Sequence, residues 1–248
     1  MNRLVTIPIS HYCEKARWAL ERAGIPYKEE RHLQGFHAIY TAKAGGSDTA
    51  PVLVTGDGVF DDSTKILQWV DSRLPEGSKL YPAANKKEIC ELEESFDEGL
   101  GVAGRLWMYT FMLKHFSVML KYSKIHGVPK FESFLMPVLY PLLRSRISQI
   151  LEMTPTSRND THNAIDKIFN DVGMILGDGR RFLTGKHFTA ADLTFAALAT
   201  PVVLPENYGV ALPTLAELPS EMVDQIRFWR SHPAGEFALR LFREERRF

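Results

Sequence analysis

Ser10-His-Tyr-Cys-Glu-Lys-Ala-Arg17 joins a short apolar run to an amphipathic segment, and this stretch decides how the chain begins to fold. The run over residues 4–9 is apolar and rich in β-branched residues, which predicts a buried strand that Pro8 terminates. The unpaired N–H groups at the start of the helix that follows predict an anion site near Ser10. That helix is predicted from apolar residues at spacings of three and four, namely Cys13, Ala16, Leu20 and Ala23.

The composition is that of a globular protein with a large core. The 248 residues are 45% hydrophobic, and 30 basic and 30 acidic side chains leave no formal net charge. This balance favours neither nucleic acid nor a membrane surface as a partner. Two cysteines, Cys13 and Cys90, are too few for a disulfide framework and lack metal-ligand spacing, so we expect a cytoplasmic location and no metal. The apolar tract over 193–205 is too short to cross a bilayer, and we expect no secretory segment.

Strand and helix signals alternate over residues 1–76, which we expect to form the first domain. Residues 27–32 and 51–55 predict further strands, and Gly56-Asp57-Gly58 predicts a tight turn into a fourth. Capping residues then precede a helical pattern that runs to residue 74. The predicted order is therefore β-α-β, a long connection, and then β-β-α.

A linker is predicted over 77–85, and beyond it the helical period continues, so residues 86–248 are expected to form an all-α domain. Small residues at Gly99, Gly101 and Gly104 allow a bend or the close approach of another segment. The expected helices include 107–122 in one piece, 134–153 with Pro137 and Pro141 kinking or dividing it, and 234–247 at the end.

A capping box marks the start of a buried helix late in the chain. Thr189-Ala-Ala-Asp192 places a threonine and a carboxylate three residues apart, so each can satisfy a free N–H group at the helix start. Phe188 and Leu193 can then pack together across that start. Thr189 and Asp192 are therefore predicted to be structural.

Together these motifs resemble those of the cytosolic glutathione transferases. The first domain carries the resemblance in the stretch 10–17, in Gly24-Ile-Pro-Tyr27, in Ala50-Pro-Val-Leu53 and in Asp62-Ser63 at a helix start. The box at 189–192 resembles the capping motif of the family's helical domain. The resemblance implies an α+β fold with a thioredoxin-like βαβ-ββα domain followed by an all-α domain, and it implies a homodimer.

The resemblance also implies a glutathione site. Ser10 holds the position of the family's thiol-activating serine, and Pro51 that of a cis-proline, so the backbone of Val52 would pair with the cysteinyl part of glutathione. Asp62 and Ser63 would bind its γ-glutamyl ammonium and carboxylate, and Lys43 lies where the family contacts the glycyl end. The helical domain would line a second-substrate pocket, with His11, Tyr12, Arg105, Met108, Tyr109 and Met112 as the candidates.

Each of these residues also has a structural interpretation. Ser10, Asp62 and Ser63 are good helix N-caps, and capping does not exclude ligand binding. His11 and Tyr12 can be exposed turn residues, and the methionines and aromatic residues after position 105 can belong to the core. Cys13 lies on the apolar helix face, which favours a buried structural thiol over a nucleophile.

The chemistry of the predicted site is nucleophilic. A thiol with a pKa of about 8.5 is only about 3% ionised at pH 7, and lowering that pKa by ~2 units takes about 2.7 kcal/mol. One hydroxyl hydrogen bond and the helix dipole together are of that order. We therefore expect a transferase that activates glutathione for attack on a small electrophile. The alternatives are a catalytically weak transferase-like scaffold that binds a protein, and a glutathione-dependent isomerase or reductive dehalogenase.

Overall fold

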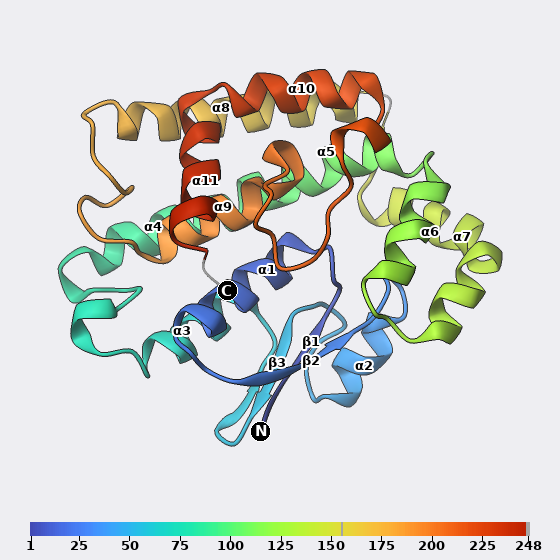
Figure 1. Cartoon of the computed structure of the whole chain (residues 1–248), viewed down its shortest axis with the longest axis horizontal. Coiled ribbons are helices and arrows are strands. Elements are labelled where there is room, and N and C mark those ends of the chain that lie inside the picture. Colours follow the sequence, from blue (N-terminus) through green and yellow to red (C-terminus); the bar gives the residue numbers. More distant parts are fainter. Residues whose placement is uncertain (155, 247–248) are drawn as a thin grey trace.

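The chain begins with a four-stranded mixed sheet that helices flank (Figure 1). The computed structural model describes residues 1–154 and 156–246. The sheet has the order β2-β1-β3-β4, with β1 parallel to β2 and antiparallel to β3, and its register places Val52 opposite Val5. The strands are β1 (Asn2–Thr6), β2 (Tyr27–Arg31), β3 (Val52–Thr55) and β4 (Gly58–Phe60).

Three helices belong to this part of the chain: α1 (His11–Arg22), α2 (His37–Lys43) and α3 (Ser63–Asp71). The predicted first strand is too long, because residues 7–10 form a turn closed by a hydrogen bond from Ser10 N to Ile7 O. The sequence analysis missed α2 inside the predicted long connection, since a seven-residue helix has only two buried positions, His37 and Thr41, to mark it.

Everything after α3 is helical or loop, which gives the two-part α+β architecture that was predicted. Short 3-10 turns at Glu76–Ser78 and Ala83–Asn85 connect the two parts, and a third, Leu215–Glu217, lies near the end. A π-helical turn, η3 (Phe96–Gly101), joins α4 (Lys86–Ser95) to α5 (Val102–Met112). The remaining helices are α6 (Phe116–Ile125), α7 (Lys130–Ile150), α8 (Ser157–Leu176), α9 (Ala190–Val203), α10 (Ser220–Arg230) and α11 (Pro233–Glu244).

The single helix predicted over 107–122 is wrong, because the chain breaks between α5 and α6. Tyr140 donates a hydrogen bond of 2.8 Å to the carbonyl of Leu113, and His115 has non-helical backbone angles. This break depends on a partner in α7, so local periodicity could not indicate it. By contrast, α7 continues through Pro137 and Pro141 as one helix. The last helix ends at Glu244 rather than at 247, and Arg247 lies outside the described residues.

The buried helix α9 is the centre of the helical part, and all its residues are buried. Its predicted capping box is present: Asp192 accepts hydrogen bonds from Thr189 N at 2.8 Å and from Leu183 N at 2.7 Å. Burial raises the pKa of Asp192 to about 6, against the opposing effect of these hydrogen bonds. Helix α1 packs against α9 on one side and α3 on the other, so the two parts share one apolar core.

Within the described ranges, no helix combines the length and hydropathy that crossing a bilayer requires.

Candidate functional site

Ser10 lies at the turn between strand β1 and helix α1. It is the N-cap of that helix: its Oγ accepts a hydrogen bond from Cys13 N at 3.4 Å, and its carbonyl accepts one from Glu14 N at 2.9 Å. The side chain is half-buried. Since Oγ accepts from the backbone, its own hydrogen can still be donated to an anion at the positive end of the helix.

A buried network that the sequence analysis missed holds this turn in place. Arg17 donates to the carbonyl of Pro8 at 2.7 Å, and Tyr208 donates to that of Ile9 at 3.1 Å. Glu14 accepts from Gly209 N and pairs with Arg17 at 3.0 Å. The spacing of Glu14 and Arg17 on one helix was a possible signal, but Tyr208 lies almost two hundred residues away and gave none.

Pro51 and Val52, the residues of the sheet that are predicted to contact glutathione, lie at the start of β3. This strand pairs with β1, the strand that leads to Ser10. The Ala50–Pro51 peptide bond is cis, as the resemblance implies, and Val52 begins β3 opposite Val5 of the central strand β1. Gly46 packs against the Val52 side chain so closely that a Cβ at Gly46 would overlap it. The loop before Pro51 is therefore fixed against β3.

Asp62 and Ser63 lie at the start of α3. Asp62 is the exposed N-cap, and its Oδ1 accepts a hydrogen bond from Lys65 N at 3.1 Å. Ser63 is 3% exposed at the first helical position. The structural interpretation of Asp62 as a cap is thus present in the structure, and it leaves one carboxylate oxygen for a ligand.

A buried cluster of charges, also missed, joins α1 to α3 and α4. Lys15 is fully buried and binds Glu93 at 2.8 Å and Asp97 at 2.7 Å, and it donates to Thr64 at 2.9 Å. Tyr81 donates to the second oxygen of Glu93. Because Thr64 follows Ser63, this cluster fixes the start of α3 relative to α1 and hence to Ser10.

His11 and Tyr12 are not exposed turn residues. His11 is 5% exposed and its Nε2 lies 3.1 Å from the carbonyl of Gly101, while Tyr12 donates to the carbonyl of Asp97 at 2.7 Å. Burial, reinforced by the charge of Arg105, lowers the pKa of His11 to about 3. The imidazole is therefore neutral at physiological pH and donates Nε2–H to Gly101.

The second-substrate candidates divide between core and surface. Tyr109 and Met112 are buried in apolar clusters, which is the core interpretation, whereas Met108 is half-buried. Arg105 is half-buried, and its Nε is buried without a hydrogen-bond partner among the described residues. Its charge opposes the rise that burial causes in the pKa of Tyr109 and Tyr12. An unpaired guanidinium thus lies close to His11 and Tyr12, just after Ser10.

Two further predicted residues have simple surroundings. Cys13 is fully buried, and burial raises the pKa of its thiol to about 11, so it is not a thiolate near neutral pH. Lys43 is exposed at the end of α2, where its ammonium lies 5.6 Å from the centre of the Tyr40 ring.

Two cavities of the helical part lie away from Ser10. Two cavities of about 550 and 570 Å³ lie around Arg180 on the helical part, and Ser10 lines neither. Over 1–154 and 156–246, no group of three or more His, Cys, Asp or Glu side chains is placed to hold a metal ion.

Comparisons with solved structures define the class of protein. The fold is similar to that of a glutathione S-transferase of Ceriporiopsis subvermispora crystallised with glutathione, with 16% identity, a TM-score of 0.67, and coverage of 100% of this chain and 98% of that one. A glutathione transferase of Phanerochaete chrysosporium gives 16% identity, a TM-score of 0.68, and coverage of 100% and 97%. The chain therefore has the two-part fold of the glutathione S-transferases.

A family model identifies the first part. Residues 4–78 match the family model of the glutathione S-transferase N-terminal domain, so the first part of the chain carries that domain. No curated protein sequence matches the chain. The resemblance stated from the sequence is confirmed for the first domain and for the fold.

Proposed function

We propose that this protein is a glutathione transferase in which Ser10 stabilises the thiolate of bound glutathione for attack on a small electrophile. The observation that carries the proposal is Ser10 itself, a half-buried N-cap whose hydroxyl hydrogen has no acceptor among the described residues. Val52 after a cis-proline and the start of α3 at Asp62 and Ser63 supply the proposed contacts to the peptide.

Two relatives in fold support glutathione as the co-substrate. The structure from Ceriporiopsis subvermispora and one from Methylobacillus flagellatus contain glutathione. In this chain, the γ-glutamyl end would lie at the start of α3 and the sulfur at the start of α1, with Lys43 near the glycyl end. The buried Lys15 cluster supports this arrangement because it joins these two helix starts.

We place the electrophile on the other side of Ser10, against α5. Arg105 and Met108 are the half-buried residues there, beside the neutral His11. Burial and the charge of Arg105 lower the pKa of His11 to about 3, so its imidazole is too weak a base to take the thiol proton near neutral pH. Ionisation of the thiol is therefore assigned to the Ser10 hydroxyl and the helix dipole alone.

Replacing Ser10 tests this assignment. A hydrogen bond to a charged group contributes about 1.5–3 kcal/mol, so Ser10→Ala should lower turnover of a general electrophile by about ten- to a hundredfold near pH 7. Glutathione affinity, measured by calorimetry, should change much less. The sulfur's ionisation midpoint in the complex, followed by ultraviolet absorbance, should rise toward that of free glutathione.

A matched variant separates catalysis from helix capping. Alanine removes both the hydroxyl and the cap, which costs about 1 kcal/mol, whereas glycine is nearly as good a cap as serine. Ser10→Gly should therefore lose turnover as Ser10→Ala does and retain more stability. Full turnover in both variants would contradict the role of Ser10.

The scaffold alternative is tested by glutathione itself. A ligand that binds only the folded state raises the melting temperature, so a shift in millimolar glutathione supports a glutathione enzyme. Absence of a shift would favour a transferase-like scaffold. A glutathione-dependent isomerase or reductive dehalogenase would use the same thiolate, and product analysis distinguishes it. A homodimer stays a prediction from the resemblance, and a cytoplasmic location stays a prediction from the low number of cysteines.

A further inference from the structure

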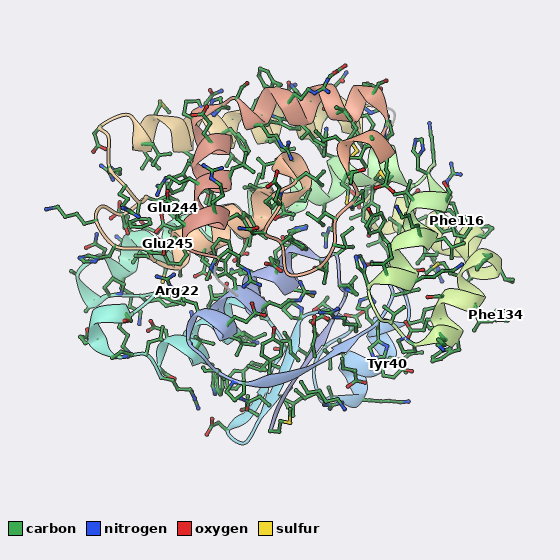
Figure 2. All side chains as sticks on the ribbon, viewed as in Figure 1. Arg22, Tyr40, Phe116, Phe134, Glu244 and Glu245 are labelled. Carbon is green, nitrogen blue, oxygen red and sulfur yellow. The ribbon has the colours of Figure 1, made fainter. Side chains whose placement is uncertain are left out.

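Helix α7 exposes an apolar ridge that no described residue of the chain covers. Phe134, Val138 and Leu142 are 81%, 77% and 63% exposed, and they follow one another along one side of the helix. Figure 2 shows Phe134 at the outer margin of the molecule. Contiguous apolar surface of this kind marks an interaction site in a soluble protein. We define the α7 ridge by its exposed apolar residues, Phe131, Phe134, Leu135, Val138, Leu139 and Leu142.

The opposite side of α7 is already occupied. Met136, Tyr140 and Ile147 are buried against α5, α6 and the loop before α2. The fully buried Glu132 anchors the helix, since it accepts from Leu33 N at 2.8 Å and binds His32 at 2.6 Å. Over residues 134–143, both the buried and the exposed side of α7 are apolar. A helix that is apolar on all sides is normally buried on all sides, so we interpret the ridge as a contact surface.

The surroundings of the ridge are strongly basic. Residues 114–150 contain six basic side chains and one acidic residue, the buried Glu132, which gives a formal charge of +5 in a chain with none overall. At 100° per residue, Lys130 lies beside Phe134 and Arg146 beside Leu142, whereas Arg144 lies on the side of the buried Tyr140, away from the ridge. In the part of the chain that the structure describes, these three residues form no ion pair, and each is exposed.

We propose that the α7 ridge docks this protein onto an anionic lipid surface. The apolar side chains would enter the boundary between headgroups and acyl chains, while Lys130 and Arg146 contact the acidic headgroups. Large apolar residues on one face with lysine and arginine beside them are the pattern of helices that lie in a membrane interface. Each basic residue near an anionic surface strengthens binding about fivefold.

The charge around the α7 ridge favours an anionic lipid surface over a second copy of this chain as its partner. Two copies paired through the ridge would bring two segments of formal charge +5 together, and like charges repel. Around a twofold axis near Val138, Lys130 of one copy would approach Arg146 of the other. An anionic bilayer satisfies both the apolar and the basic parts of the surface. The net charge of the whole chain does not reveal this basic surface, because acidic residues elsewhere in the chain cancel its charge.

Vesicle sedimentation tests the proposal on the full-length protein. Wild-type protein should pellet with vesicles of equal parts phosphatidylcholine and phosphatidylserine, far less with phosphatidylcholine alone, and less again in raised salt. Phe134→Asp/Val138→Asp should reduce the partition coefficient at least tenfold. Lys130→Gln/Arg146→Gln should reduce it about twenty- to thirtyfold with acidic vesicles only.

Controls keep the result interpretable. The substituted residues are exposed, so circular dichroism and the melting temperature should match the wild type. Met174→Asp changes a side chain that is 72% exposed on α8, outside the basic segment, and should bind vesicles as the wild type does. Lipid binding needs no glutathione, so its failure leaves the proposed transferase function untouched.

Two outcomes would overturn the proposal. One is equal binding of wild type and ridge variant to acidic vesicles, or no binding by either. The other is a wild-type dimer in analytical ultracentrifugation that Phe134→Asp/Val138→Asp converts to a monomer while neither binds vesicles, which would assign the ridge to a second copy.

Discussion

His11 and Tyr12 follow Ser10 directly, yet they contact the helical part rather than solvent. Their partners are backbone carbonyls of η3, Gly101 for His11 and Asp97 for Tyr12. The N-cap role of Ser10 could be predicted from its residue type and from the helix that follows it. The surroundings of His11 could not, because Gly101 lies ninety positions further along and no local pattern points to it.

The neutral His11 has a consequence for acid stability. Its pKa is about 3 when folded and 6.5 when unfolded, so below pH 6.5 the unfolded chain binds a proton that the folded chain does not. Stability should therefore fall as the pH drops from 6.5, by about 2 kcal/mol at about pH 5 from this group. His11→Gln keeps a donor for Gly101 and cannot titrate. Its urea midpoint should fall less between pH 7.5 and pH 5, and equal losses in both proteins would contradict the prediction.

At the scale of elements, η3 is the segment of the helical part that contacts the start of α1. The run of small residues around position 101 predicted a bend or a close approach, and the close approach occurs: Tyr12 packs onto Gly101, at the end of the π-helical turn that joins α4 to α5. By contrast, the division of 107–122 into two helices depends on Tyr140 and could not be predicted locally.

The contact of Tyr12 with Gly101 should be sensitive to one methyl group. A Cβ at Gly101 would overlap Tyr12 Oη, which is held by Asp97, so Gly101→Ala should destabilise the protein by about 1–3 kcal/mol. Tyr12→Phe removes the hydroxyl oxygen, which is the atom that a Cβ at Gly101 would overlap most. In chemical denaturation, Gly101→Ala/Tyr12→Phe should therefore be more stable than the sum of the single changes predicts.

Gly99 provides the matched control. A Cβ there would lie 3.0 Å from Ile168 Cδ1, the far end of a flexible side chain, and alanine favours helix over glycine by up to about 1 kcal/mol. Gly99→Ala should therefore be close to neutral. If Gly99→Ala lowered the free energy of unfolding as much as Gly101→Ala does, a sensitivity of η3 to any alanine substitution would explain both results.

At the scale of the whole molecule, ion pairs join the two parts of the chain. Lys15 binds Glu93 and Asp97, and at the other end of α1 Arg22 pairs with Glu245 at 3.0 Å near the end of the chain (Figure 2). Charged residues are usually exposed, so a sequence gives no reason to pair Lys15 with a carboxylate some eighty positions away.

The Lys15 cluster should couple stability to glutathione affinity. Lys15→Met leaves the buried Glu93 and the half-buried Asp97 without a counter-charge, and breaking a buried ion pair typically costs about 3–5 kcal/mol. It also removes the link from α1 to Thr64, so the calorimetric affinity for glutathione should fall. Lys15→Met/Glu93→Gln removes one stranded charge and should recover part of the urea midpoint. A Lys15→Met midpoint equal to that of the wild type would refute the coupling.

The sequence by itself determined what depends on neighbours along the chain: the βαβ-ββα order, the Ser10 and Asp62 caps, and the box at Thr189 and Asp192. These follow from side-chain period and from hydrogen bonds that span three or four residues. Tertiary structure alone decided the burial of His11, the Lys15 cluster and the exposure of the α7 ridge. Burial and charge compensation depend on groups that only folding brings together, so an apolar period indicates a helix face without saying whether anything covers it.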